Sequence, residues 1–213
     1  AEDVRRYGIW MREEAFKRIG HLYPRVKITK EMIKERPDLK GYEGKELTVI
    51  AWLWARTVKS PNPKFREVEV PLVSTFVLSS KEGRNTYLEP VVKGKKYFFK
   101  VKIGKLNSEI ESGTKIKGFT FKCLLSGVPI SSEYIKEQGS KGEMGQRLLA
   151  CVVELDKGRT FISDENMYIP AVENYDEIWK PDVDLDGKSA DQLPSYGFKK
   201  YWQLFTERQI AAL

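Results

Sequence analysis

The sequence predicts an α+β fold, in which a mostly antiparallel sheet of about six to eight strands lies between helices at both termini. Three observations lead to this prediction. Apolar residues recur at three- and four-residue spacing near the start of the chain, a β-rich run begins at Leu47, and a helix-capping sequence occurs near the end. The successive β-rich runs are joined by short links, which favours antiparallel pairing.

Residues 1–24 are predicted to form an N-terminal helix. Gly20 and Pro24 are typical of the end of a helix. The apolar residues of this segment share one helical face, which would pack against another surface. They are Val4, Tyr7, Met11, Ala15, Ile19 and Leu22.

Residues 25–180 are predicted to form a β-rich domain. The run from Leu47 to Val58 is almost continuously apolar, so we expect a strand buried on both faces. Short helices are expected at 30–36, where Pro37 stops the helix, and from the cap Ser131 to Glu137. The glycines at 139–145 are interpreted as an ordinary loop. The strands are expected at 25–29, 47–58, 68–79, 86–92, 96–103, 115–125, 147–155 and 159–163.

Residues 181–213 are predicted to be a linker followed by the start of a C-terminal helix. Thr206 and Gln209 have the spacing of a capping box, so the helix should begin at Glu207. The stretch 181–196 contains two prolines and several acidic residues, as a solvated linker does. Its aspartates lack the glycine and the final glutamate of a calcium-binding EF-hand loop, so no calcium site is predicted.

The basic charge is concentrated in one window. Residues 93–122 hold nine lysines and two glutamates. The net charge of this window is therefore +7, the same as the net charge of the whole chain of 213 residues. Phenylalanines and a tyrosine lie among these lysines. Exposed lysines next to aromatic rings are typical of surfaces that neutralise phosphates and stack bases. A solvated sheet face in a lysine-rich protein is the competing interpretation.

Strand alternation then selects the residues of a candidate nucleic-acid interface. Phe99, Val101 and Ile103 should share one face of a strand, with Lys100, Lys102 and Phe98 on the other. Lys115 and Lys117 should lie opposite Ile116 on the next strand. If these strands stack side by side, their lysines form one patch. The predicted nucleic-acid-binding residues are Lys96, Phe98, Lys100, Lys102, Lys115 and Lys117.

Other classes of function find little support. Two cysteines, Cys123 and Cys151, are too few for a disulfide framework, and Cys151 lies in an apolar run typical of a core. A single histidine allows no Ser-His-Asp or Cys-His arrangement of the kind found in hydrolases. No signal peptide and no apolar run of roughly 20 residues is present, which predicts a cytoplasmic protein without a membrane partner.

The end of the chain resembles a known family. Five residues after Gly197 the chain reads Trp202-Gln203-Leu204-Phe205-Thr206-Glu207-Arg208-Gln209. This pattern is similar to a segment of archaeal and bacterial adenine-specific DNA methylases with a zinc-ribbon-like insertion. Near the start, Glu2-Asp3-Val4-Arg5 and Trp10-Met11-Arg12-Glu13-Glu14-Ala15 are similar to a helix of the same family. The resemblance covers nearly the whole chain. It implies the middle of a larger enzyme, between the cofactor-binding motif and the catalytic Asp-Pro-Pro-Tyr motif.

The resemblance also implies a zinc ribbon that has lost its metal. The family has a cysteine knuckle where this chain has Ser60-Pro61-Asn62-Pro63-Lys64-Phe65, and a second one where it has Cys123-Leu124-Leu125-Ser126-Gly127. Structural zinc needs four thiolate or imidazole ligands. Only Cys123 keeps a ligand, so we expect a hairpin scaffold without zinc.

By resemblance, the parent enzyme uses S-adenosylmethionine to methylate the N6 atom of adenine in DNA. This chain contains neither the glycine-rich cofactor motif nor Asp-Pro-Pro-Tyr, so no catalytic or cofactor-binding residue is assigned, and the segment alone should be inactive. Its expected partners are DNA and the remaining parts of the methylase. Two alternatives stay open: a stand-alone nucleic-acid-binding module, and an inert insertion that bridges the two halves of a methylase.

Overall fold

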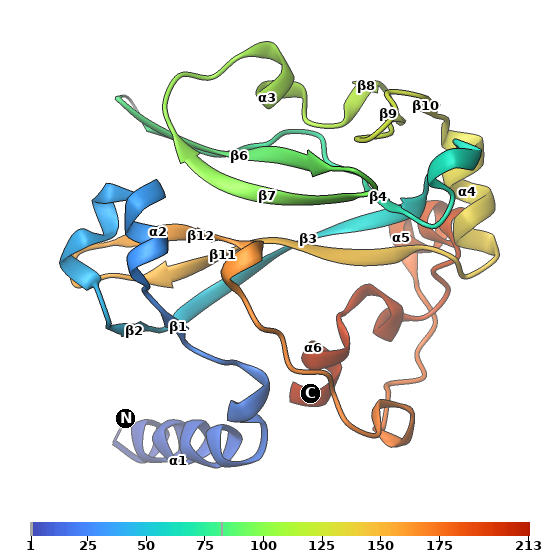
Figure 1. Ribbon diagram of the computed structural model, residues 1–213. Helices are drawn as coiled ribbons and strands as arrows, with labels where there is room; N and C mark the ends of the chain where they lie inside the picture. Colours follow the sequence, from blue (N-terminus) through green and yellow to red (C-terminus); the bar gives the residue numbers. More distant parts are fainter. Residues whose placement is uncertain (1, 82) are drawn as a thin grey trace. The chain divides into compact units, whose positions relative to one another are not determined.

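The computed structural model describes residues 2–81 and 83–213 and has the predicted α+β fold (Figure 1). Ala1, which was counted with the N-terminal helix, lies outside the described residues. The chain divides into two compact units. Unit 1 comprises residues 1–25, 168–193 and 198–213, and unit 2 comprises residues 26–167 and 194–197. The sequence-based division placed its boundaries after residues 24 and 180.

Unit 2 is built on a four-stranded antiparallel sheet with the order β12-β11-β3-β4. Its central strands are β3 (Val49–Lys59) and β11 (Gly145–Glu154), flanked by β12 (Arg159–Ser163) and β4 (Glu69–Pro71). Residues 148–153 of β11 are all buried, as the apolar run predicted. Along β3 the burial is only partial, since Ile50 is 51% exposed, so the expectation of burial on both faces was wrong for this strand.

A three-stranded antiparallel sheet with the order β5-β6-β7 lies across one face of this sheet (Figure 1). Its strands are β5 (Val77–Lys81), β6 (Arg84–Lys93) and β7 (Lys96–Ile103). Phe99, Val101 and Leu88 from this sheet pack with Ala55, Leu149 and other residues of the larger sheet in one core cluster. Alternation along β7 therefore buries Phe99 and Val101 as predicted.

One end of unit 2 is covered by short elements that precede β3. They are β1 (Val26–Lys27), α2 (Lys30–Glu35), the 3-10 helix η2 (Pro37–Tyr42) and β2 (Glu46–Leu47), which pairs with β1. The hydroxyl of Thr29 caps α2 by accepting from Met32 N at 3.3 Å. Val26, Ile28, Met32 and Leu39 pack there against Cys151, Val153 and Ile162 of the large sheet.

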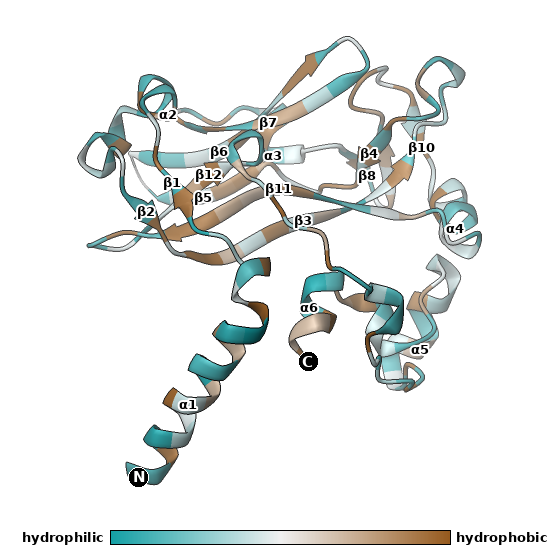
Figure 2. Cartoon of the chain, turned by 60° about the horizontal axis from the view of Figure 1, so that its bottom comes forward, coloured by the Kyte–Doolittle hydropathy of each residue, from teal (hydrophilic) through white to brown (hydrophobic). Residues whose placement is uncertain are grey.

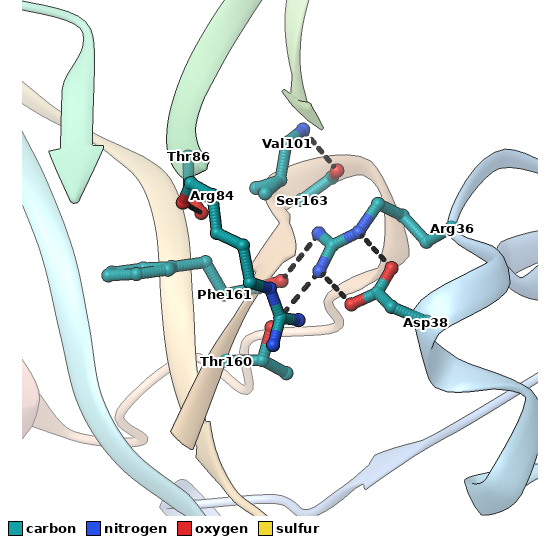
Figure 3. Close-up of polar contacts among 8 residues, drawn as sticks. All are labelled: Arg36, Asp38, Arg84, Thr86, Val101, Thr160, Phe161 and Ser163. Atoms are coloured by element: carbon teal, nitrogen blue, oxygen red, sulfur yellow. Dashed lines mark hydrogen bonds and ion pairs between the residues drawn. The ribbon is translucent and has the colours of Figure 1, made fainter. Parts of the chain in front are cut away.

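Arg36 fastens these covering elements to the sheet (Figure 3). Its side chain is buried, and its guanidinium donates to both carboxylate oxygens of Asp38, at 2.8 and 2.7 Å. It also donates to Phe161 O and to Thr160 Oγ1 on β12, each at 3.0 Å. With four hydrogen bonds made inside the protein, the guanidinium is engaged in holding the fold together.

The other end of unit 2 carries a small three-stranded sheet with the order β10-β9-β8. The strands are β8 (Lys115–Lys117), β9 (Thr120–Lys122) and β10 (Pro129–Ile130), with α3 (Ser108–Ser112), α4 (Ser132–Ser140) and η3 (Pro63–Phe65) around them. Ser131 caps α4 as predicted, by accepting from Tyr134 N at 3.2 Å. The helix continues three residues beyond the predicted end at Glu137, so it includes Gly139.

Two predicted strands were wrong in their extent. The segment 68–79 is split between β4 and β5, which belong to different sheets. The split is stabilised by Thr114, whose buried hydroxyl donates to Pro71 O at 2.8 Å and accepts from Val73 N at 2.9 Å. The segment 115–125 is a hairpin, because Gly118 (φ +54°) turns the chain between β8 and β9.

Unit 1 is mostly helical. It contains α1 (Glu2–Ile19), η1 (Gly20–Leu22), η5 (Tyr175–Glu177), α5 (Gly187–Gln192), η7 (Tyr201–Leu204) and α6 (Glu207–Ala212). The predicted capping box is confirmed, since Gln209 N donates to Thr206 Oγ1 at 3.3 Å and Thr206 N donates to Gln209 Oε1 at 2.8 Å. The guanidinium of the buried Arg208 donates to Leu22 O at 2.7 Å, and the Tyr23 hydroxyl donates to the carbonyl oxygen of Arg208 at 2.8 Å.

The predicted linker at 181–196 is folded rather than open. It contains α5 and the 3-10 helix η6 (Leu193–Tyr196). Its aspartates are also not free for a cation, because Lys200 Nζ lies 2.9 Å from carboxylate oxygens of both Asp182 and Asp184. This lysine supplies the opposite charge that a calcium ion would otherwise provide.

Large apolar side chains of α1 remain exposed. Figure 2 shows hydrophobic residues recurring along this helix between hydrophilic ones. None of the residues of α1 is buried. Of the predicted apolar face, Leu22 is buried beyond the end of α1, whereas Val4 (77% exposed), Tyr7 (69%) and Met11 (63%) are not covered by any of the described residues. Within residues 2–81 and 83–213, no helix combines the length and the apolar character needed to cross a bilayer.

Candidate nucleic-acid interface

The structure distributes the predicted lysines over two hairpins. Lys96 begins β7, directly opposite Lys93 at the end of β6, and Lys95 lies in the turn between them. All three lysines are exposed. Among the residues that the structure describes, none of these three lysines has a carboxylate within ion-pair distance. The β6–β7 turn therefore presents three lysines without an ion-pair partner among the described residues, two of which, Lys93 and Lys95, were not among the predicted interface residues.

Lys100 and Lys102 lie further along β7, in a different environment. Lys100 Nζ forms an ion pair with Glu35 Oε1 of α2. This hydrogen bond raises the pKa of Lys100 and lowers the pKa of Glu35, and the nearby charge of Lys102 lowers the pKa of Glu35 further. The charges of Glu165 and Glu89 also act on Lys100. These two lysines thus belong to a mixed cluster in which carboxylates already balance much of the charge.

Phe98 lies on the same face of β7 as Lys100 and Lys102, as alternation predicted. It is half-buried, and Lys93 Nζ lies 5.1 Å from the centre of its ring. The lysine covers the ring in a cation–π contact, so a base would have to displace Lys93 to stack on Phe98.

Lys115 and Lys117 lie on β8, which belongs to a different sheet from β7. The expected side-by-side stacking of these strands was therefore wrong. β8 instead pairs with β9, with an irregularity in register between Lys115 and Lys117. No carboxylate of the described residues forms an ion pair with either lysine. Between β8 and β9, Phe119 is 68% exposed, and on β8 itself Ile116 is 54% exposed.

Sequence reasoning missed three parts of this surface, namely Lys93, Lys95 and Phe119. The signal for Phe119 was present in the sequence, because Lys117-Gly118-Phe119-Thr120 has glycine at the first position of a possible two-residue turn. The pairing of Glu35 with Lys100 joins residues 65 positions apart, and no local pattern indicates it.

A pocket of about 410 Å³ opens in unit 2 and is lined by residues of β6, of α3 and its flanks, and of the segment 122–127. Val92 and Pro90 of β6, Ile110 of α3 and Leu124 form apolar parts of its wall. Glu89 and Glu109 also line it, with Lys122 as the one cation among the lining residues. Two carboxylates against one ammonium group make this pocket unfavourable for phosphate, so we place the candidate interface on the hairpins rather than in the pocket.

Ser60 and Cys123, which the resemblance aligns with two zinc knuckles, come together in unit 2. Ser60 Oγ lies 3.2 Å from Cys123 Sγ, and Asn62 N donates to Ser60 Oγ at 3.3 Å. Burial raises the pKa of the Cys123 thiol, but the Ser126 and Ser60 hydroxyls and the backbone of Leu125 and Ser126 outweigh it and lower the pKa. Ser126 Oγ is buried, and no hydrogen bond that it makes to a described residue has regular geometry.

These knuckle residues do not fit zinc, because serine is a poor ligand and Phe65 offers none. Within residues 2–81 and 83–213, no group of three or more histidine, cysteine or acidic side chains could hold a metal ion. The second cysteine, Cys151, is fully buried in β11 beside Met167, and burial raises its pKa to about 12. It is a core residue.

Comparisons with protein-family models, with curated proteins and with solved structures find no match to this chain.

Proposed function

We propose that this chain is a non-catalytic segment of a cytoplasmic, S-adenosylmethionine-dependent DNA adenine-N6 methyltransferase, and that its two lysine-bearing hairpins contact DNA. The observation that carries the DNA contact is the pair of hairpins. Lys93, Lys95 and Lys96 on one, and Lys115 and Lys117 on the other, carry charges that no carboxylate of the described residues neutralises in an ion pair. The methyltransferase assignment rests on the resemblance of the two ends of the chain.

The methyl donor does not fit this segment. Nucleotide-type cofactors bind where a glycine-rich loop follows a strand and opens a helix. Here the glycines at 139–145 come in the reverse order, because they begin inside α4 and lead into β11. We assign no step of methyl transfer to residues of this chain.

The exposed stripe on α1 favours a segment of a larger assembly over a stand-alone module. Trp10 (60% exposed) and Phe16 (69% exposed) are exposed on this helix together with Val4, Tyr7 and Met11. Large apolar side chains exposed together on one element are typical of surfaces that bind another protein surface. In the proposed enzyme, the remaining parts of the methylase would cover this helix.

The chain alone should be catalytically silent. It contains no motif for the donor or for the target amino group, so we expect no methyl transfer to adenine-containing DNA and no donor binding in the micromolar range. Radiolabelled methyl transfer and calorimetry with S-adenosylmethionine measure both. Turnover above background would show that the catalytic residues lie within these 213 residues and that the proposal is wrong.

The hairpin lysines should give salt-dependent DNA binding. If five lysines each meet one phosphate, the logarithm of affinity should fall against the logarithm of salt concentration with a slope of about −4 to −5. Changing Lys93, Lys95, Lys96, Lys115 and Lys117 to alanine should flatten this slope. It should also leave the fold intact, because four of these lysines are exposed, the half-buried Lys115 forms no ion pair with a described residue, and such lysines contribute little to stability. Fluorescence titration at several salt concentrations measures the slope.

The matched control removes the same charge elsewhere in unit 2. Lys27, Lys34, Lys40, Lys64 and Lys157 are exposed lysines outside the two hairpins. A variant with these five changed to alanine has the same net charge as the hairpin variant and should keep most of the slope. Equal losses in both variants would mean that only net charge matters. Absence of binding by the unmodified chain at low salt would favour the inert insertion.

A further inference from the structure

We infer that Phe119, at the tip of the β8–β9 hairpin, stacks on an unpaired base of the DNA that the hairpin lysines hold. The inference rests on the proposed function and adds to it the kind of nucleic acid recognised, which is single-stranded or locally unstacked DNA.

The hairpin presents Phe119 to solvent from a firm base. Lys117 pairs with Thr120, so the turn consists of Gly118 and Phe119 alone, and a two-residue turn with positive φ at its first residue holds one conformation. Below the tip, Lys122 N donates to Thr114 O at 2.7 Å and Cys123 N donates to Val128 O at 2.8 Å. Phe121 packs on the core cluster of Cys123 and Ile130. The ring at the tip is thus exposed but not loosely attached.

The charge around the tip identifies the class of partner. Residues 113–132 contain Lys115, Lys117 and Lys122 and no acidic residue. An exposed ring among cations fits a polyanion that also offers flat apolar faces, which is the chemistry of unstacked bases on a phosphate backbone. Proteins that deform DNA also insert single apolar side chains such as phenylalanine between base steps. The tip, with the exposed Ile116 on β8, offers far less apolar surface than stable membrane anchoring takes.

The experiment compares F119A, F119W and the unmodified chain on two labelled DNAs. One is a single strand containing 2-aminopurine, and the other is a fully paired duplex of the same sequence. F119A should bind the single strand about 5- to 150-fold more weakly, because stacking on one base contributes that much. F119W should restore binding, and the salt slope should stay the same in all three. The fluorescence of 2-aminopurine should be quenched by the unmodified chain and by F119W but not by F119A.

Tyr168 provides the matched control, as an aromatic side chain that is 78% exposed and far from the hairpin in sequence. Y168A should bind as the unmodified chain does. If the unmodified chain binds with the expected slope but F119A binds equally well, the inference is wrong and the proposed function stands. If the unmodified chain binds no DNA, both are wrong. Binding to phosphatidylserine vesicles that F119A loses, without any effect on DNA, would assign the tip to a membrane surface and overturn the inference.

Discussion

Replacing Arg36 with alanine should lower the free energy of unfolding by about 3 kcal/mol, one of the largest effects expected from a single substitution in this chain. Removing one partner of a buried ion pair costs about 3–5 kcal/mol because the other charge is left unpaired. The lower end applies here, since the Asp38 side chain is 23% exposed. The change also removes the hydrogen bonds to Phe161 O and Thr160 Oγ1 that join η2 to β12. Urea unfolding followed by circular dichroism measures the difference.

Two further variants test the cause. R36K keeps the charge but cannot donate to both carboxylate oxygens and to β12 at once, so it should recover only part of the loss. R36A/D38A should be more stable than R36A, because it leaves no unpaired carboxylate. If R36K is as stable as the unmodified chain, the fork of hydrogen bonds in Figure 3 contributes nothing and the interpretation is wrong.

The effect of Arg36 should also depend on pH. Burial raises the pKa of Asp38, but the hydrogen bonds and charge of Arg36 outweigh it, and the net result is a lowered pKa. A carboxylate with a lowered pKa in the folded state stabilises the fold above its unfolded pKa of about 3.9 and loses this contribution as the pH falls through the folded value. The difference in unfolding free energy between the unmodified chain and R36A should therefore be largest at neutral pH and should decrease below about pH 4.

Cysteines introduced at three positions should create a zinc site with a binding free energy on the order of 10 kcal/mol. The unmodified chain should hold no stoichiometric zinc, since Ser60, Phe65 and Ser126 stand where the resembling family has three of its four thiolates. The triple variant S60C/F65C/S126C should bind about one zinc per chain. Two of the four positions already meet, because Ser60 Oγ lies 3.2 Å from Cys123 Sγ. Gly127 (φ +70°) closes the second loop through its N–H to Cys123 O at 2.8 Å.

Elemental analysis of protein purified without chelator measures the zinc content, and cobalt substitution reports on tetrahedral thiolate coordination. S60C/F65C/S126A, which lacks one ligand, provides the control and should bind zinc far more weakly. One zinc per unmodified chain would show that the ligands lie elsewhere. Absence of zinc in the triple variant would show that the two loops do not bring the four cysteines into tetrahedral positions.

Local sequence signals predicted the regular elements well. The strands at 96–103 and 159–163 have the bounds that alternation indicated, and the capping box of Thr206 and Gln209 begins α6 at Glu207. In each case the information lies within a few residues of the element, in an apolar period or in a cap.

Features that depend on distant partners could not be predicted. The change of sheet between β4 and β5 depends on Thr114, about 40 residues away in sequence, which is fully buried and bonds to Pro71 and Val73. The charge of Lys100 is paired by Glu35, which lies on a helix whose packing no local pattern indicates. The lysine window was visible from composition, but only the tertiary structure shows which lysines are exposed and which are paired.

The two cysteines have a consequence for measuring how this protein opens. Cys151 belongs to the core cluster under α2, and Cys123 to the one beside α4. Both are almost completely inaccessible, and a thiol with a pKa of about 12, as Cys151 has, yields almost no reactive thiolate at neutral pH. An alkylating reagent can therefore reach each sulfur only during a transient opening of its own cluster. Labelling kinetics followed by mass spectrometry would therefore measure the opening rate of each end of unit 2 separately.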